Sequence, residues 1–122
     1  MHTKILIVTN DNVLYLLLKT FIESSGNLVM CEKISDHQQL GKEDTDTSLK
    51  LIIVDGKMVD VSSIELIYRM RYEYMILCNI WFLTEIQSEV YLNKALEVGA
   101  NRIINKPIDP QEFSKEVINY IQ

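Results

Sequence analysis

Short runs of apolar residues alternate with amphipathic stretches along most of the chain. The apolar runs predict five buried strands, at residues 4–10, 28–34, 51–55, 79–84 and 102–105. After the first run, apolar residues recur at helical spacing over 13–22, and Gly26 supplies a stop signal. The stretch 35–48 is mostly polar and predicts at most a short, weakly amphipathic helix around residues 36–40.

Capping residues mark the other predicted helices. Ser62 and Glu65 have the spacing of a capping box, which opens a helix after the third strand. A helix over 88–98 ends before a glycine, and Asp109 begins the last helix with a proline in its first turn. Five strand-helix units in this order predict an α/β fold with a doubly wound parallel sheet. No linker or repeat interrupts the pattern, so residues 1–122 are expected to form one domain.

Composition and charge limit the possible functions. The 122 residues are 48% hydrophobic and 24% charged, which is typical of a globular domain. The 17 acidic and 12 basic residues give a net charge of -5, and no basic stripe is present, so direct nucleic-acid binding is not expected. The apolar stretches are too short to span a bilayer and lack signal-peptide features, which favours the cytoplasm. Cys31 and Cys78 lack the spacing of a zinc site and are expected to be reduced core thiols.

Polar residues directly follow four of the predicted strands. They are Asn10 and Asp11 after the first strand, Asp55 after the third, Thr84 after the fourth and Lys106 after the fifth. In doubly wound sheets, ligands collect beyond the carboxyl ends of the strands, so these side chains are expected to share one edge. Carboxylate oxygens suit Mg²⁺, and an ammonium and a hydroxyl can hold an anion. The sequence therefore predicts a site that could hold a metal and a phosphoryl group together.

Each of these residues also has a simpler interpretation. Asp55 could be a turn residue before Gly56, and Asp11 and Thr84 could cap helices. Lys106 could be a solvated lysine at the end of a strand. We favour the shared site, because four polar residues with unrelated roles would otherwise have to lie at the same edge of the sheet by chance. Two carboxylates there would repel each other, so Asp55→Asn is expected to leave the protein as stable or more stable.

This set of residues, closed by the segment Asn-Lys-Pro at 105–107, resembles the receiver domain of two-component response regulators over the whole chain. The resemblance implies a flavodoxin-like receiver fold with strand order 2-1-3-4-5. It also implies that Asp55 accepts a phosphoryl group from a histidine kinase or a phosphotransfer protein. Such a domain is a signalling switch rather than an enzyme, since its only chemistry is self-catalysed formation and hydrolysis of the aspartyl phosphate.

The resemblance further implies a magnesium site at the phosphoacceptor. Asp11 and Asp55 would bind Mg²⁺ directly, the backbone carbonyl of Lys57 would complete the coordination, and Asn10 would hold a metal-bound water.

The same resemblance assigns the residues that contact the phosphoryl group. The Thr84 hydroxyl would donate to a phosphoryl oxygen, and Lys106 would pair with the group, ahead of a cis Lys106–Pro107 bond. The resemblance also implies a homodimer through the face formed by the fourth helix, the fifth strand and the fifth helix. In this count of helices, the stretch around 36–40 is the second helix.

Several positions depart from the family pattern. Asn10 replaces one of two acids that usually follow the first strand, which predicts weaker Mg²⁺ binding. Val59 and Ser63 replace a proline and a glycine of the loop after Asp55, and Glu85 stands where a small residue is usual. Ile103 replaces the aromatic switch residue of the fifth strand.

These departures leave a second function open. The chain could be a pseudo-receiver that serves as a protein interaction module without phosphorylation. A flavin-binding or hydrolytic enzyme on the same fold is disfavoured, because residues 9–12 lack the small-residue phosphate loop that a flavin needs.

Overall fold

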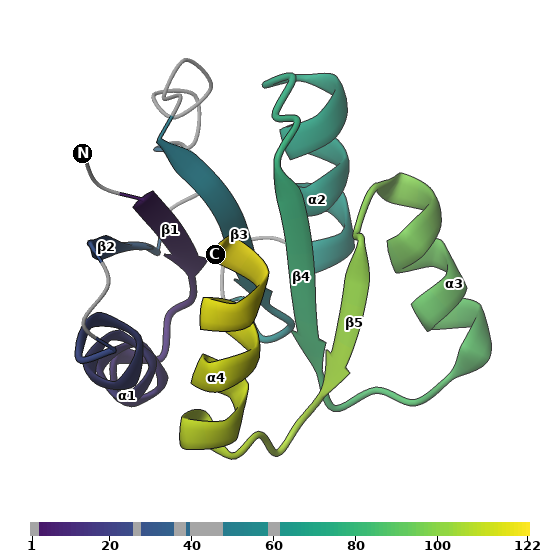
Figure 1. Cartoon of the computed structure of the whole chain (residues 1–122). Helices are drawn as coiled ribbons and strands as arrows, with labels where there is room; N and C mark the ends of the chain where they lie inside the picture. Colours follow the sequence, from purple (N-terminus) through teal and green to yellow (C-terminus); the bar gives the residue numbers. More distant parts are fainter. Residues whose placement is uncertain (1–2, 26–27, 36–38, 40–47, 59–61) are drawn as a thin grey trace.

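The computed structural model describes residues 3–25, 28–35, 39, 48–58 and 62–122 (Figure 1). Its strands are β1 (Thr3–Val8), β2 (Val29–Ile34), β3 (Leu49–Asp55), β4 (Asn79–Thr84) and β5 (Arg102–Asn105). Its helices are α1 (Asn12–Glu23), α2 (Ser63–Tyr72), α3 (Glu89–Val98) and α4 (Pro110–Ile121). The strands form one parallel sheet in the order β2-β1-β3-β4-β5, which confirms the predicted topology.

Helices cover both faces of the sheet, with α1 and α4 on one face and α2 and α3 on the other (Figure 1). Successive side chains of a strand point to opposite faces, so Ile5 and Ile7 pack toward α1 and α4 while Leu6 and Val8 pack toward α2 and α3. A strand that is buried on both faces needs apolar residues at every position. This is why the central strands read as continuous apolar runs.

The predicted caps set the helix boundaries. Asp11, Ser62, Ser88 and Asp109 have extended backbone conformations, and each side chain accepts hydrogen bonds from amides of the first turn that follows it. Gly99 ends α3 with a φ of 130°, a conformation that a residue with a side chain rarely adopts. No helix in the described ranges is long and apolar enough to cross a membrane.

The observed elements agree with the predicted ones to within about two residues. One difference matters for the site: β1 ends at Val8 rather than at residue 10, so Thr9 and Asn10 belong to the turn before α1. The short helix expected around 36–40 falls largely outside the described residues. Because the strands are parallel, the residues that follow β1, β3, β4 and β5 meet at one edge of the sheet.

Candidate functional site

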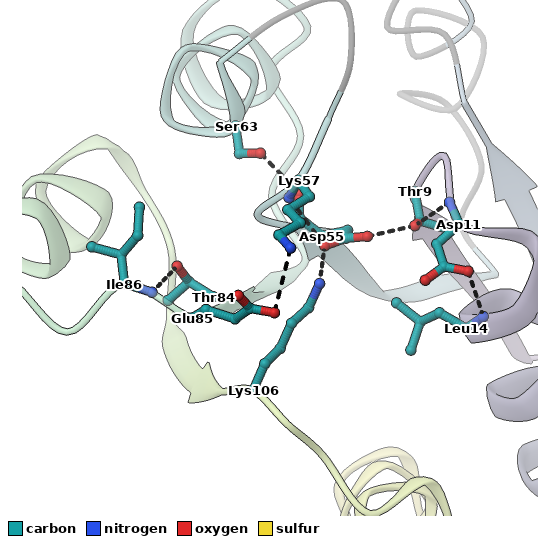
Figure 2. A network of polar contacts seen from close by, with 10 residues as sticks. All are labelled: Thr9, Asp11, Leu14, Asp55, Lys57, Ser63, Thr84, Glu85, Ile86 and Lys106. Carbon is teal, nitrogen blue, oxygen red and sulfur yellow. Dashed lines mark hydrogen bonds and ion pairs between the residues drawn. The ribbon is translucent and has the colours of Figure 1, made fainter.

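Asp55, the last residue of β3, is the centre of a polar network at this edge (Figure 2). Its side chain is only 2% exposed. Oδ1 forms an ion pair with Nζ of Lys106 and accepts a hydrogen bond from the backbone amide of Lys57 at 3.1 Å. Oδ2 accepts a hydrogen bond from the hydroxyl of Thr9 at 2.7 Å. The buried carboxylate is thus paired and hydrogen-bonded through both oxygens, which offsets its desolvation.

Lys106 reaches Asp55 from the far side of β4. Its backbone amide donates to the carbonyl of Thr84 at 2.9 Å, which continues the ladder between β4 and β5 by one residue. The Lys106–Pro107 bond is cis, as the resemblance implies. The side chain is 14% exposed, so the pair with Asp55 lies in a partly buried environment where a charge interaction is stronger than at the surface.

Thr84 is the last residue of β4 and is 2% exposed. Its Oγ1 accepts a hydrogen bond from the amide of Ile86 at 3.1 Å, which shapes the turn that leads to α3. Gly56 brings the end of β3 close to this turn, because its amide donates to the Leu83 carbonyl at 2.7 Å. A Cβ at Gly56 would lie 2.6 Å from that carbonyl oxygen. Glycine is therefore required for the close approach of Asp55 and Thr84 along the backbone.

Two further contacts surround the phosphoacceptor candidate. The side chains of Lys57 and Glu85 are 3.6 Å apart and join the loops after β3 and β4 (Figure 2). Both are largely exposed, so this pair contributes little to stability. Ser63, at the first position of α2, donates its hydroxyl to the backbone carbonyl of Asp55 at 2.8 Å. This bond holds the start of α2 against the end of β3; Val59, which was expected to alter the same loop, lies outside the described residues.

Asp11 and Asn10, the other side chains expected near a metal, make contacts with groups other than Asp55. Asp11 caps α1, because its Oδ1 accepts hydrogen bonds from the amides of Val13 and Leu14 at 3.0 and 3.1 Å. The contact drawn from its carboxylate runs to the Leu14 amide, and none joins it to Asp55 (Figure 2). The side-chain amide of Asn10 donates to the carbonyl of Ser35 at 3.1 Å, at the end of β2.

Thr9 is the residue that meets Asp55 from the end of β1, and the sequence analysis did not single it out. The signal was present, because Thr9 is the first polar residue after the apolar run that ends at Val8. The predicted strand ended two residues later than β1 does, so Asn10 and Asp11 were expected at the site in place of Thr9.

These placements test whether the pocket fits Mg²⁺, which the family resemblance implies. Both oxygens of Asp55 already have partners, and no hydrogen bond or ion pair joins its side chain to a second carboxylate in the described part of the chain. Among the described residues, no group of three acidic, histidine or cysteine side chains could hold a metal ion. Mg²⁺ requires near-octahedral geometry with carboxylate and other oxygen ligands. The residues as arranged do not fit a magnesium site.

Comparison with known proteins identifies the family. The model of the response regulator receiver domain family matches residues 5–118. The chain belongs to this family. Receiver domains are signalling domains rather than enzymes, which confirms that expectation.

Solved receiver structures share the fold of this receiver domain. A two-component response regulator from Clostridium difficile has a TM-score of 0.83 at 22% identity, and the match covers 98% of this chain and 96% of that one. A CheY-like receiver domain protein from Methanospirillum hungatei has a TM-score of 0.79 at 21% identity, over 98% and 93% of the two chains. The flavodoxin-like receiver fold is therefore confirmed.

Two curated relatives are longer than this receiver domain. The transcriptional regulatory protein CrdR of Helicobacter pylori is 26% identical over 119 residues, which are 96% of this chain and 54% of CrdR. The autoinducer 2 sensor kinase/phosphatase LuxQ of Vibrio vulnificus is 26% identical over 117 residues, and the match covers 96% of this chain and 13% of LuxQ. The chain thus spans about half of one relative and a small part of the other.

Proposed function

We propose that this receiver domain accepts a phosphoryl group on Asp55 from a phosphohistidine of a histidine kinase or phosphotransfer protein, and that the product changes its protein contacts. The observation that carries the proposal is the ion pair between Lys106 and the buried Asp55. The ammonium of Lys106, which follows β5, thus contacts the carboxylate of Asp55 at the end of β3. A cation held at this position can stabilise negative charge on a phosphoryl group attached to Asp55.

The transfer uses an oxygen of Asp55 as the nucleophile. Oδ2 accepts a single described hydrogen bond and keeps a second lone pair for attack. The new bond forms between this oxygen and phosphorus, while the phosphorus–nitrogen bond of the phosphohistidine breaks and the released imidazole nitrogen takes a proton from water. The acyl phosphate carries about two negative charges, one more than the carboxylate it replaces.

Three groups of the pocket can hold the added charge. Lys106 supplies the ammonium and the backbone amide of Lys57 supplies a fixed donor. The hydroxyl of Thr84 accepts a hydrogen bond from Ile86, so its own proton can be donated to a phosphoryl oxygen.

Thr84 also connects the pocket to the rest of the domain. A movement of its hydroxyl toward a phosphoryl group would strain or break the bond from Ile86 and shift the turn that leads into α3. Ile103, on β5, packs against the core beneath α2 and α3 and has no ring to rotate. We therefore assign the output to this turn and to the neighbouring face of α3, β5 and α4. A second copy of the receiver domain is the proposed partner there, since β5 is an edge strand and Val90 of α3 is 81% exposed.

Labelling with phosphoramidate tests the proposal. The donor has the same phosphorus–nitrogen bond as a phosphohistidine, and intact-mass spectrometry counts the phosphoryl groups that are transferred. We expect one group on the wild type, none on Asp55→Asn, and one on the control Glu97→Gln, which removes a carboxylate from the exposed end of α3. Labelling of Asp55→Asn would contradict the proposal. A wild type that folds and binds its partner but takes no label would support the phosphorylation-independent interaction module instead.

A further inference from the structure

We propose that the Asp55 pocket works without a divalent cation, because Thr9 and Lys106 already serve the two oxygens at which a metal would bind. The inference rests on the proposed phosphoacceptor role and concerns what neutralises the site. It departs from the Mg²⁺ that membership of the family implies.

The position of the Thr9 hydroxyl is fixed from two sides. Thr9 is fully buried, and its Oγ1 accepts a hydrogen bond from the amide of Asp11 at 3.0 Å. The same oxygen lies 2.7 Å from Oδ2 of Asp55, so its proton is directed at that carboxylate oxygen. A metal bound at Oδ2 would lie beside the positive end of this O–H group and compete with it for the same oxygen.

The charges of the pocket lead to the same conclusion. The negative charge of Asp55 is matched by the ammonium of Lys106 on Oδ1. Thr9 and Asn10, which follow β1, are both uncharged. A divalent cation at Asp55 would enter beside an ammonium that this carboxylate already neutralises, which is unfavourable in a partly buried site.

Asp11 already serves the start of α1 through one of its carboxylate oxygens. Its carboxylate caps α1 by accepting hydrogen bonds from Val13 and Leu14. If the side chain turned toward Asp55, these two amides of the first helical turn would lose their partner. A metal that drew Oδ1 of Asp11 toward Asp55 would therefore compete with the cap of α1.

Magnesium titration of the unphosphorylated protein tests the inference. Amide chemical shifts of Gly56 and Lys57 report binding at Asp55, and broadening by Mn²⁺ provides an independent readout. We expect no saturable change in the wild type at millimolar Mg²⁺. The double variant Thr9→Asp, Asn10→Asp places carboxylates on the β1 side of Asp55 and should bind Mg²⁺ about tenfold more tightly or better. Asn10→Asp alone serves if the buried Thr9→Asp change prevents folding, because Asn10 is only half-buried.

A control variant separates the effect of a carboxylate added at position 9 from the effect of losing the Thr9 hydroxyl. Thr9→Val removes the hydroxyl without adding a carboxylate and should remain unable to bind Mg²⁺. Saturable binding by the wild type at millimolar Mg²⁺ or below would overturn the inference, as would loss of phosphoramidate labelling on addition of EDTA. The titration needs no phosphoryl donor, so it decides the metal question even if Asp55 is never labelled and the proposed function fails.

Discussion

The substitution Asp55→Asn removes one charge from the centre of the site with little change in shape. The new side chain can still accept the hydrogen bond from the Lys57 amide, but Lys106 loses its negatively charged partner. The ammonium then remains in a site where it is only 14% exposed. We expect the substitution to lower the free energy of unfolding.

The magnitude follows from how deeply the pair is buried. Removing one partner of a fully buried ion pair costs about 3–5 kcal/mol. Lys106 retains some exposure and has a flexible stem, so its ammonium can move toward water and recover part of this cost. We therefore expect a loss of about 1–3 kcal/mol at neutral pH. The sign is opposite to the expectation from sequence, because the structure pairs Asp55 with an ammonium and engages Asp11 in the cap of α1.

Urea unfolding followed by fluorescence of the single tryptophan measures this loss. Trp81 is 3% exposed and packs between Phe113 and Tyr120, so its emission should change on unfolding. The double variant Asp55→Asn, Lys106→Met provides the matched control, since it removes both charges and should regain part of the lost stability. If Asp55→Asn is as stable as the wild type, the ion pair does not hold the site as described.

Three further predictions concern Gly56, Glu85 and Cys31. Gly56→Ala should lower the free energy of unfolding in urea by about 1–3 kcal/mol, because its Cβ would lie 2.6 Å from the Leu83 carbonyl oxygen; an unchanged value would show that the loop can move away. Glu85→Ala should speed phosphoramidate labelling, because it removes a negative charge that repels the donor beside the pocket. The control Glu97→Ala should leave the rate unchanged, and equal labelling rates in the two variants would show that the Glu85 charge does not slow labelling. Burial raises the pKa of the Cys31 thiol to about 12, so native Cys31 should stay unmodified by thiol reagents at pH 8 and react once urea unfolds the protein. Peptide mass mapping measures the modification, and prompt modification of the native protein would contradict this prediction.

The fold was predictable from sequence because the strands are buried on both sides. Residues such as Ile52 and Ile53 are both fully buried although they face opposite layers, so the apolar run is continuous and easily recognised. Short polar segments and local caps then separate the helices from the strands. The strand order could not be derived from periodicity, since it depends on long-range pairing, and it came from the family resemblance.

The site was predictable only in part, for a physical reason. Asp55, Thr84 and Lys106 end or directly follow well-defined strands, so their meeting at one edge follows from the parallel sheet. On the β1 side, a shift of two residues in the end of the strand decides which side chain faces Asp55 and which one caps α1. The sequence pattern was compatible with both roles for Asp11, and the structure assigns the cap to Asp11 and the contact with Asp55 to Thr9.

Reductive trapping of the labelled protein tests the phosphoacceptor claim most directly. Borohydride reduces an acyl phosphate to an alcohol and so converts a phosphorylated aspartate to homoserine, which peptide mass spectrometry can locate in the sequence. After incubation with phosphoramidate, we predict homoserine at position 55 and at no other aspartate. Homoserine at a different position, or none in a folded wild-type protein, would contradict the account.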